Sequence, residues 1–210
     1  MKICDFKKSR GELMKISRFA EIINGTAQFR IVESINNSDH DYVVYDQNHL
    51  IADLTFESKS ENKIAKHIRT SNSVQTLNSG DLVYSLVSGM AAIVSEKHSG
   101  FLQTRNYLKI VPNGTYDKQY LAFMLNESRD VRRQIAKNIQ GSVIVKLSSE
   151  VVSNIDIQET NFEIQRKIGG TYMNYQKVSS LRAKKQELEK SLLIGTLESL
   201  SDGGEYYGNL

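Results

Sequence analysis

The chain has 210 residues, of which 40% are hydrophobic and 24% are charged. This length suits one medium-sized domain with an appendage, and the composition excludes an intrinsically disordered chain. The net charge of +3 permits binding to nucleic acid without favouring it, so any DNA-binding surface would be a local patch.

A single cysteine, Cys4, excludes an internal disulfide and indicates a reducing, cytoplasmic setting. No apolar stretch approaches the roughly 20 residues that a membrane-spanning helix needs. The first residues, MKICDFKKSRGELMKISRF, have no apolar core of the kind found in signal peptides. The sequence therefore predicts a cytoplasmic protein without a membrane partner.

The first 35 residues predict a leader, a helix and a strand. Residues 1–14 are polar and predict the leader. Apolar residues near helical spacing follow, and they predict a helix that Asn24 and Gly25 end as a C-cap. The alternation in AQFRIVESI predicts a strand.

The middle of the chain predicts mainly strands. The stretch DYVVYDQNHLIADLTF predicts a hairpin around a turn at residues 46–48. Residues 57–78 are polar and predict a loop with at most one helical turn. Strands are expected at Asp81–Leu86 and Met90–Ser95, and another in TRNYLKIVP, which Pro112 closes.

Helical and strand patterns then alternate irregularly. The stretch YDKQYLAFMLNESRDVRRQIAKNI has an apolar face and predicts an amphipathic helix, whereas SVIVKL and VSNIDIQ predict short strands. Because strands and helices mix without a regular βαβ repeat, the fold class expected is α+β rather than a doubly wound sheet.

A long helix is predicted over residues 160–200. Apolar residues there mostly step by 3, 4 or 7, and polar residues fill the gaps over about four heptads, which is typical of a coiled coil. Such a helix would extend roughly 60 Å, much longer than the preceding domain could bury. Gly169 and Gly170 mark a weak point within it, and residues 201–210 predict a disordered tail.

The chain carries no motif that supports catalysis or cofactor binding. It has no G-x-G-x-x-G, no P-loop, no nucleophile elbow and no Cys/His cluster with metal-ligand spacing. We therefore expect no catalytic residue, no metal site and no cofactor in this chain.

The order of several segments resembles the specificity (S) subunit of type I restriction-modification enzymes. The segments that carry the resemblance are GDLVYSLVSGMAAIV, NYLKIVPN, YDKQYLAFMLN, KLSSEVVSNIDI and EIQRKIG, the last of which opens the long helix. The resemblance covers about Ile16 to Leu193, and GSVIVKL…IDI…EIQRKIG is its sharpest part. No single motif is diagnostic, but the ordered set is fairly specific.

The chain departs from the family in two ways. The strand before the E-x-Q segment usually contains a proline, which IDIQET lacks. A complete S subunit also holds two target recognition domains and two conserved helices, whereas this chain has room for one of each. It therefore resembles a half-S form.

The resemblance implies different functions for the two main parts of the chain. Residues 15–159 would be a target recognition domain that reads double-stranded DNA. The long helix would be a spacer and dimerisation arm that also docks the methyltransferase (M) subunits, with the restriction (R) subunit as a possible further partner. Adenine N6 methylation from S-adenosylmethionine would be the work of the M partner, on a base flipped out of the duplex.

Polar and basic side chains in expected loops are the candidates for reading DNA, because base edges are read by amide, hydroxyl and guanidinium groups and phosphates by Lys and Arg. The candidates are Gln28, Arg30, Gln47, Asn48, Lys66, Arg69, Ser71, Asn72, Lys97, His98 and Arg105. The alternative for each is ordinary solvated surface. The basic face of RDVRRQIAK could lie on phosphates or in solvent.

The apolar positions of the long helix are the candidates for a helix–helix interface in a homodimer. They are Ile168, Tyr172, Tyr175, Val178, Leu181, Leu188 and Leu192. Two other functions stay open: a coiled-coil scaffold that binds only proteins, and a regulatory or decoy half-S chain that binds M subunits without reading DNA.

Overall fold

The computed structural model of the chain describes residues 12–56, 65–139 and 147–201. Its strands are β1 (Leu13–Lys15), β2 (Ala20–Asn24), β3 (His40–Val43), β4 (His67–Thr70), β5 (Leu82–Ser85), β6 (Ala91–Ile93), β7 (Tyr107–Pro112) and β8 (Asp156–Gln158). Its helices are α1 (Ile16–Phe19), α2 (Gln47–Thr55), α3 (Lys118–Glu127), α4 (Arg129–Ile139), α5 (Ser149–Ser153) and α6 (Phe162–Ser201), with short 3₁₀ turns η1 (Gln28–Arg30) and η2 (Glu96–His98).

A four-stranded antiparallel sheet, in the order β2-β7-β5-β6, organises the head of the molecule. Successive side chains of a strand point to opposite faces. Leu82 and Tyr84 of β5 accordingly join one buried cluster, and Val83 between them joins a second. The sheet is therefore buried on both faces.

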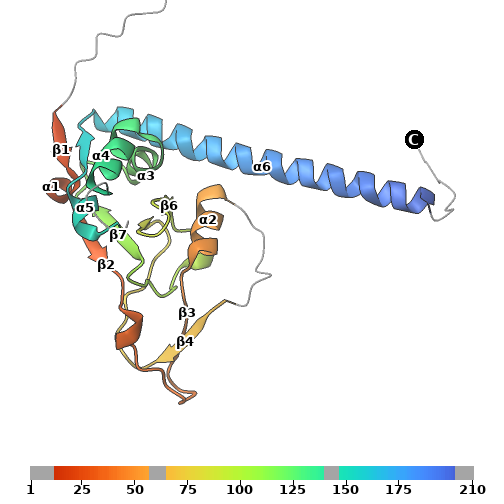
Figure 1. Ribbon diagram of the computed structural model, residues 1–210, viewed down its shortest axis with the longest axis horizontal. Helices are drawn as coiled ribbons and strands as arrows, with labels where there is room; N and C mark the ends of the chain where they lie inside the picture. The colour runs from red at the N-terminus through yellow and green to blue at the C-terminus, as the bar shows by residue number, and fades with distance from the viewer. Residues whose placement is uncertain (1–11, 57–64, 140–146, 202–210) are drawn as a thin grey trace, which may run out of the picture.

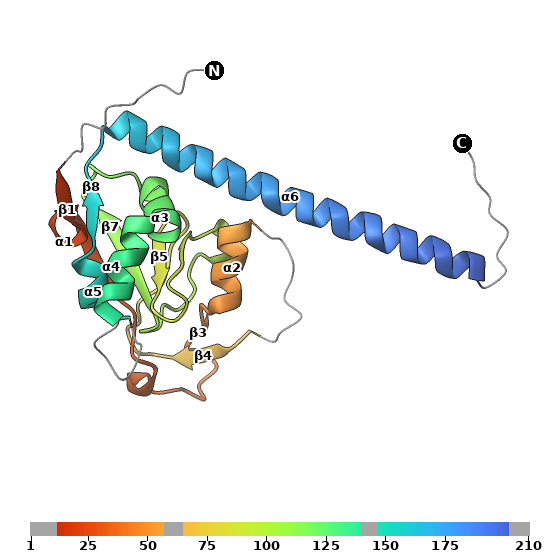
Figure 2. The ribbon, with the colours of Figure 1, turned by 45° about the horizontal axis from the view of Figure 1, so that its top comes forward.

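Helices cover the two faces differently (Figures 1 and 2). The larger cluster includes residues of α1, α3, α4 and α5, and the smaller one includes Leu50 and Leu54 of α2. Two small antiparallel sheets, β1–β8 and β3–β4, complete the head. The α+β class expected from the sequence is confirmed.

The long helix is confirmed as well. Helix α6 is continuous through Gly169 and Gly170, and it leaves the head as a single rod in Figures 1 and 2. From Leu181 to Ser201 its side chains are exposed, apart from partial cover at Thr196. The strands expected around 81–86, 90–95 and before Pro112 are also present as β5, β6 and β7.

Two N-terminal predictions are wrong. The expected helix ending at Asn24 is only four residues long, because Ala20–Asn24 form β2 and pair with β7 from Ala20 opposite Pro112. The expected strand in AQFRIVESI is absent, and Gln28–Arg30 form η1 instead. Pairing with a distant strand outweighs the local helical spacing here.

The predicted hairpin at residues 41–56 is wrong in its second half, which is helix α2. Asp46 caps this helix: its side chain accepts hydrogen bonds from the backbone of Asn48 and His49, and the His49 ring accepts one from the backbone of Asp46. This reciprocal cap satisfies backbone donors that a helix start leaves unpaired. Gln47 and Asn48 thus lie in the first turn of a helix rather than at a hairpin tip.

Three further segments differ from expectation. Residues 67–70 of the expected polar loop form β4, and the long amphipathic helix divides at Ser128 into α3 and α4. Leu13 and Met14, expected in the leader, lie in β1 and pair with β8. The strand expected in SVIVKL lies outside the described residues except for Leu147.

Candidate nucleic-acid interface and helical arm

A surface groove of about 720 Å³ lies between four separate segments of the head. Its lining comprises Asn24, Ala27, Gln28, Phe29, Leu86, Thr104, Arg105, Asn106, Leu147, Ser148 and Ser149. These residues come from the end of β2 with the following η1, the residue after β5, the turn before β7, and the start of α5. We call this hollow the amide groove, after Asn24, Gln28 and Asn106.

Close backbone contact holds two walls of the groove together. Gly25 lies against the backbone of Thr104 so tightly that a β-carbon there would collide with its carbonyl group. Thr26 donates its backbone N–H to Gln103 O at 2.8 Å, and Arg105 donates to Thr26 O at 3.2 Å. Gln28 and Arg105, far apart in the sequence, therefore line one groove.

The lining suits recognition of base edges. Amide, hydroxyl and guanidinium groups can donate to or accept from bases, and none of the described residues that line the groove is Asp or Glu. Arg105 and Asn106 are exposed. Asn24, Asn106, Ser148 and Ser149 were not among the candidates from the sequence, because their proximity depends on the fold.

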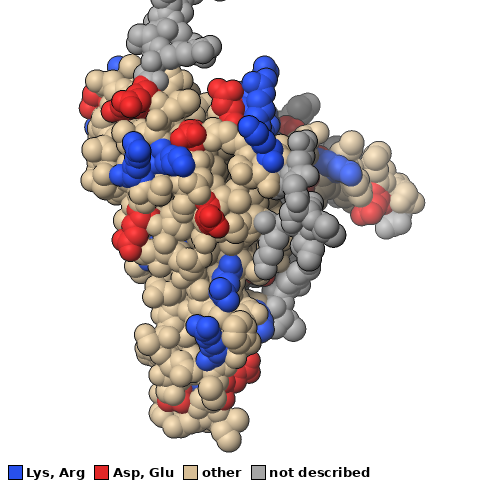
Figure 3. Space-filling model, turned by 60° about the vertical axis from the view of Figure 1, so that its left-hand side comes forward, with Lys and Arg blue, Asp and Glu red and all other residues tan. Residues whose placement is uncertain are grey.

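Charge on this side of the head is mixed. Figure 3 shows Lys and Arg side chains interspersed with Asp and Glu, without a large patch of one sign. Phosphate contacts would therefore come from individual basic residues around the groove. Arg30, which directly follows the lining residue Phe29 in η1, is exposed.

A second group of candidates lies on the β3–β4 end of the head. Lys66, Ser71 and Asn72 are exposed there. Arg69 donates to Asn37 Oδ1 at 2.7 Å, and Asn72 Oδ1 accepts from the backbone of Val32 at 2.9 Å. Arg69 and Asn72 thus hold the loop that follows η1, which is a structural role that the sequence did not indicate.

The remaining candidates lie apart from the amide groove. Asn48 is exposed at the start of α2, while Gln47 is half-buried and accepts a hydrogen bond from Ser85 Oγ at 3.3 Å. Lys97 is exposed on η2. The expectation of an exposed His98 is wrong, since this residue is only 9% exposed.

His98 belongs to a buried polar network around Asp53. The His98 Nδ1 atom lies 2.7 Å from Asp53 Oδ1, and Tyr45 donates its hydroxyl to Asp53 Oδ2 at 2.8 Å. Burial raises the pKa of Asp53, but hydrogen bonds from His98, Ser95 and Tyr45 outweigh it and leave the pKa below its ordinary value. The network fastens η2 to α2 and leaves His98 unsuited to contact a base.

Helix α6 is fastened to the head by its first three turns. Gln165 is 1% exposed: its side chain accepts from the backbone of Asp117 at 2.9 Å and donates to Thr115 O and Thr160 O. Gly169 lies against the first turn of α3, where a β-carbon would stand 2.5 Å from the backbone nitrogen of Tyr120. We call these three turns the anchor.

Two residues expected in a dimer seam belong to this anchor instead. The Tyr172 hydroxyl accepts from Asn126 Nδ2 at 3.1 Å, and the ring packs at 5.6 Å, between centroids, on Phe123. Ile168 packs against the larger core cluster. Their apolar character serves contacts within the chain, so the prediction that they form a helix–helix interface is not supported by their positions.

The other predicted seam residues are exposed on the free part of α6. Tyr175, Val178, Leu181, Leu188 and Leu192 have between 44% and 73% of their surface exposed. An apolar hollow of about 460 Å³ lies at the head end of this row, between Phe123 and Tyr175. We call the five residues the exposed row.

The described part of the chain contains neither a candidate metal site nor a membrane-spanning helix. Within residues 12–56, 65–139 and 147–201, no three His, Cys, Asp or Glu side chains are grouped to hold a metal ion. Among the helices described there, none is long and apolar enough to cross a membrane.

Comparison with known proteins gives no match by sequence and several by structure. No protein-family model and no curated protein matches the chain. The HsdS subunit from Thermoanaerobacter tengcongensis superposes with a TM-score of 0.58 at 16% identity, covering 96% of this chain and 51% of that one.

Two further solved structures agree. The S subunit of a type I restriction-modification system from M. genitalium gives a TM-score of 0.51 at 11% identity, covering 90% of this chain and 45% of that one. A chain from a structure that describes assembly of the type I R-M system gives 0.59 at 13% identity, with 97% and 52% covered.

This chain has the fold of a type I specificity subunit. It spans about half the length of the S subunits it matches. The resemblance seen in the order of sequence segments is confirmed at the level of fold.

Proposed function

We propose that the chain is a non-catalytic DNA-recognition subunit of a type I restriction-modification system. Its head would read a short DNA sequence through the amide groove. Its long helix would set the spacing to a second head and help position adenine methyltransferase subunits, and with them a restriction subunit. The observation that carries the proposal is the S-subunit fold, which extends over 90–97% of the chain.

The geometry of the groove supports DNA reading over the alternative of a protein scaffold. A scaffold requires no concentration of amide and guanidinium groups in a hollow without carboxylates, whereas base recognition does. Gln28 and Arg105, two of the residues proposed to read bases, lie in this hollow.

A second head would come from a second copy of the chain. Identical chains most often pair about a two-fold axis, and an antiparallel pair of α6 helices would place the heads at opposite ends. Each head would then read the same sequence on opposite strands. The expected target is an interrupted palindrome with half-site centres about 34–36 Å apart or somewhat more.

Methylome sequencing tests the proposal directly. The chain is co-expressed with its methyltransferase partner in cells that lack other adenine methylation, and the methylated motif is mapped. We expect an interrupted palindrome. An asymmetric bipartite motif would mean that another S chain supplies the second head, an unbroken short motif would remove the spacer role of α6, and no methylation beyond that of the methyltransferase alone would overturn the function.

Substitutions of groove residues, measured in the same experiment, test whether the groove reads the bases. Gln28→Ala and Arg105→Ala each remove a proposed base contact, which is worth about 1–3 kcal/mol, so we expect methylation of the motif to fall or its sequence to relax. Arg18→Ala, an exposed arginine on α1 outside the groove lining, is the control and should methylate as the parent does.

A further inference from the structure

Phe29 is an unusually exposed aromatic residue for its position. Its side chain is 78% exposed, although it lies in the middle of η1 and lines the amide groove. Phenylalanine is among the residues most often buried, because water solvates its ring poorly. Exposure of a single apolar residue is common on protein surfaces, but this ring lines a polar groove, where a partner bound in the groove would cover it.

The backbone around Phe29 is held on both sides. On one side, Thr26 is bonded to Gln103 and Arg105, and its hydroxyl accepts from the backbone of Gln75 at 2.8 Å. On the other side, Val32 donates its backbone N–H to Asn72 Oδ1 at 2.9 Å. The ring thus projects from a fixed support, and little conformational freedom would be lost when a flat partner packs on it.

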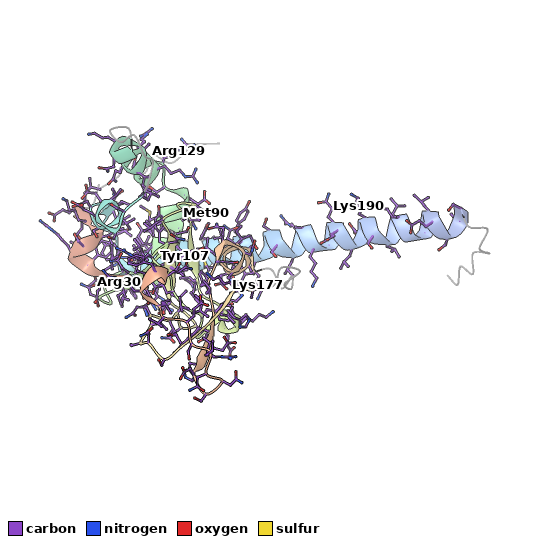
Figure 4. The ribbon with its side chains drawn as sticks, turned by 60° about the horizontal axis from the view of Figure 1, so that its bottom comes forward. Arg30, Met90, Tyr107, Arg129, Lys177 and Lys190 are labelled. Carbon is purple, nitrogen blue, oxygen red and sulfur yellow. The ribbon has the colours of Figure 1, made fainter. Side chains whose placement is uncertain are left out.

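The chemistry next to the ring suits a nucleic-acid base. Gln28 and Arg30 flank Phe29 in η1, and the Arg30 guanidinium carbon lies 5.6 Å from the centroid of the Phe29 ring. Figure 4 shows Arg30 on the head, far from the free part of α6 that carries Lys190. An aromatic ring beside a guanidinium and amide groups can stack on a base while its neighbours bind the base edge and the phosphate.

We propose that Phe29 packs against a DNA base and opens one base step of the recognised half-site. Apolar wedges of this kind enter between stacked bases and bend the duplex, and the larger protein surface that the bent duplex then covers offsets the cost of unstacking. Phe29 is then a positioning residue, which fixes the register of the head while the amide groove reads the adjacent bases. This inference rests on the proposed function, since it requires that the head binds DNA.

Two other exposed apolar residues near η1 provide matched controls. Val32 is 71% exposed and Ile35 is 100% exposed. Neither lines the groove, and neither has an aromatic ring to stack. A protein partner on this end of the head would cover the aliphatic residues together with Phe29, so the controls separate the two occupants.

The absence of tryptophan from the chain makes a direct optical test possible. Phe29→Trp introduces the only indole, and Ile35→Trp introduces it nearby on the same loop. The full chains, together with the methyltransferase, are titrated with a DNA duplex that carries the motif mapped by methylome sequencing, and both binding and emission excited selectively through indole are recorded. Signals are referred to the parent complex, which carries any tryptophan of the methyltransferase itself.

We expect DNA to quench the indole of the Phe29→Trp complex and to leave that of the Ile35→Trp complex unchanged. Phe29→Ala should weaken binding by about 5- to 150-fold, whereas Val32→Ala should change it by at most about twofold. Binding without quenching, or equal losses for Phe29→Ala and Val32→Ala, would overturn the inference and leave the proposed function intact. Absence of DNA binding by the parent complex would overturn both.

Discussion

Asp53 shows how one buried carboxylate can connect distant parts of the head. It is 3% exposed and receives hydrogen bonds from Tyr45, from the backbone of Ser95 and from the His98 ring. These partners come from the segment before α2 and from η2. An unsatisfied charge in this position would be costly, so the network is expected to contribute to stability and not to DNA binding.

The contribution of Asp53 to the free energy of unfolding should therefore decrease as the pH falls. Its folded-state pKa is held below the ordinary value of 3.8, so the unfolded chain takes up the proton first as pH falls. The stabilisation is fully present above 3.8 and is lost as pH falls through the lower folded-state pKa. Asp53→Asn should lower the free energy of unfolding at neutral pH by about 1–3 kcal/mol, with a smaller difference at about pH 3.

Urea unfolding at the two pH values checks this expectation. Asp41→Asn is the control, because Asp41 pairs with His67 where the two side chains are 40% and 52% exposed; such pairs are worth little. If Asp53→Asn matched the parent at both pH values, the network would be without consequence for stability.

At the scale of elements, the junction between α3 and α6 depends on a glycine. Gly169 allows α6 to lie directly on the first turn of α3, and the adjacent Gly170 has no such neighbour: a β-carbon there would stand 4.0 Å from its nearest atom, the Gln119 side chain. Both glycines lie inside the same helix. Only one of them is required by packing.

Alanine substitutions at the two positions should have opposite effects. Gly169→Ala forces α3 and α6 apart and should destabilise the head by about 1–3 kcal/mol. Gly170→Ala, its control, should stabilise by about 0.5–1 kcal/mol, because alanine favours a helix over glycine. Thermal unfolding of the two variants checks this, and a stable Gly169→Ala protein would show that the junction is looser than its geometry indicates.

The sequence correctly predicted the elements whose structure follows from the pattern of neighbouring residues. The exposed, periodic α6 and the apolar, β-rich β5 and β6 were predicted correctly because neighbouring residues determine them. Helix α2 was missed because Asp46, Gln47 and Asn48 were interpreted as a turn, whereas Asp46 is a helix cap. Strand β4 is too polar to stand out, and it forms because it pairs with β3.

The candidate site was less predictable than the fold. Gln28 and Arg105 could be proposed from residue type, but only the contact between Gly25 and Thr104 brings their segments together. The exposure of His98 was mispredicted because its hydrogen-bond partner in the buried network, Asp53, is 45 positions away. Ile168 and Tyr172 have the same apolar spacing as the exposed row, so spacing alone could not separate the anchor from a dimer seam.

At the scale of the whole molecule, the exposed row is an apolar surface that the described residues of the head do not cover. Leu188 is 60% exposed and Leu192 is 73% exposed, on a part of α6 that the described residues of the head leave uncovered. A second α6 helix would cover these side chains, as heptad spacing favours.

Leu188→Glu tests whether this row holds two copies together. It would bury an unpaired charge in the seam, which costs several kcal/mol, so we expect the dimer to dissociate while each head stays folded. Sedimentation measures the change, and Lys190→Glu, which alters the charge of the same helix turn without touching the row, is the control. Equal assembly of Leu188→Glu and the parent would show that the chain pairs elsewhere or not at all.

The anchor also acts as the pivot of a lever. From Tyr175 to Ser201 the free arm of α6 measures about 39 Å, so a tilt of about 5° at Gln165, Gly169 and Tyr172 moves its far end sideways by about 3.4 Å. If two antiparallel arms hold two heads on DNA, a tilt of that size displaces one head by that distance across the axis of the arms and leaves the separation of the heads along the arms almost unchanged. Whether both heads meet the DNA in line would then be decided at the anchor, in the stiffness of three turns of helix, and not at the groove that reads the bases.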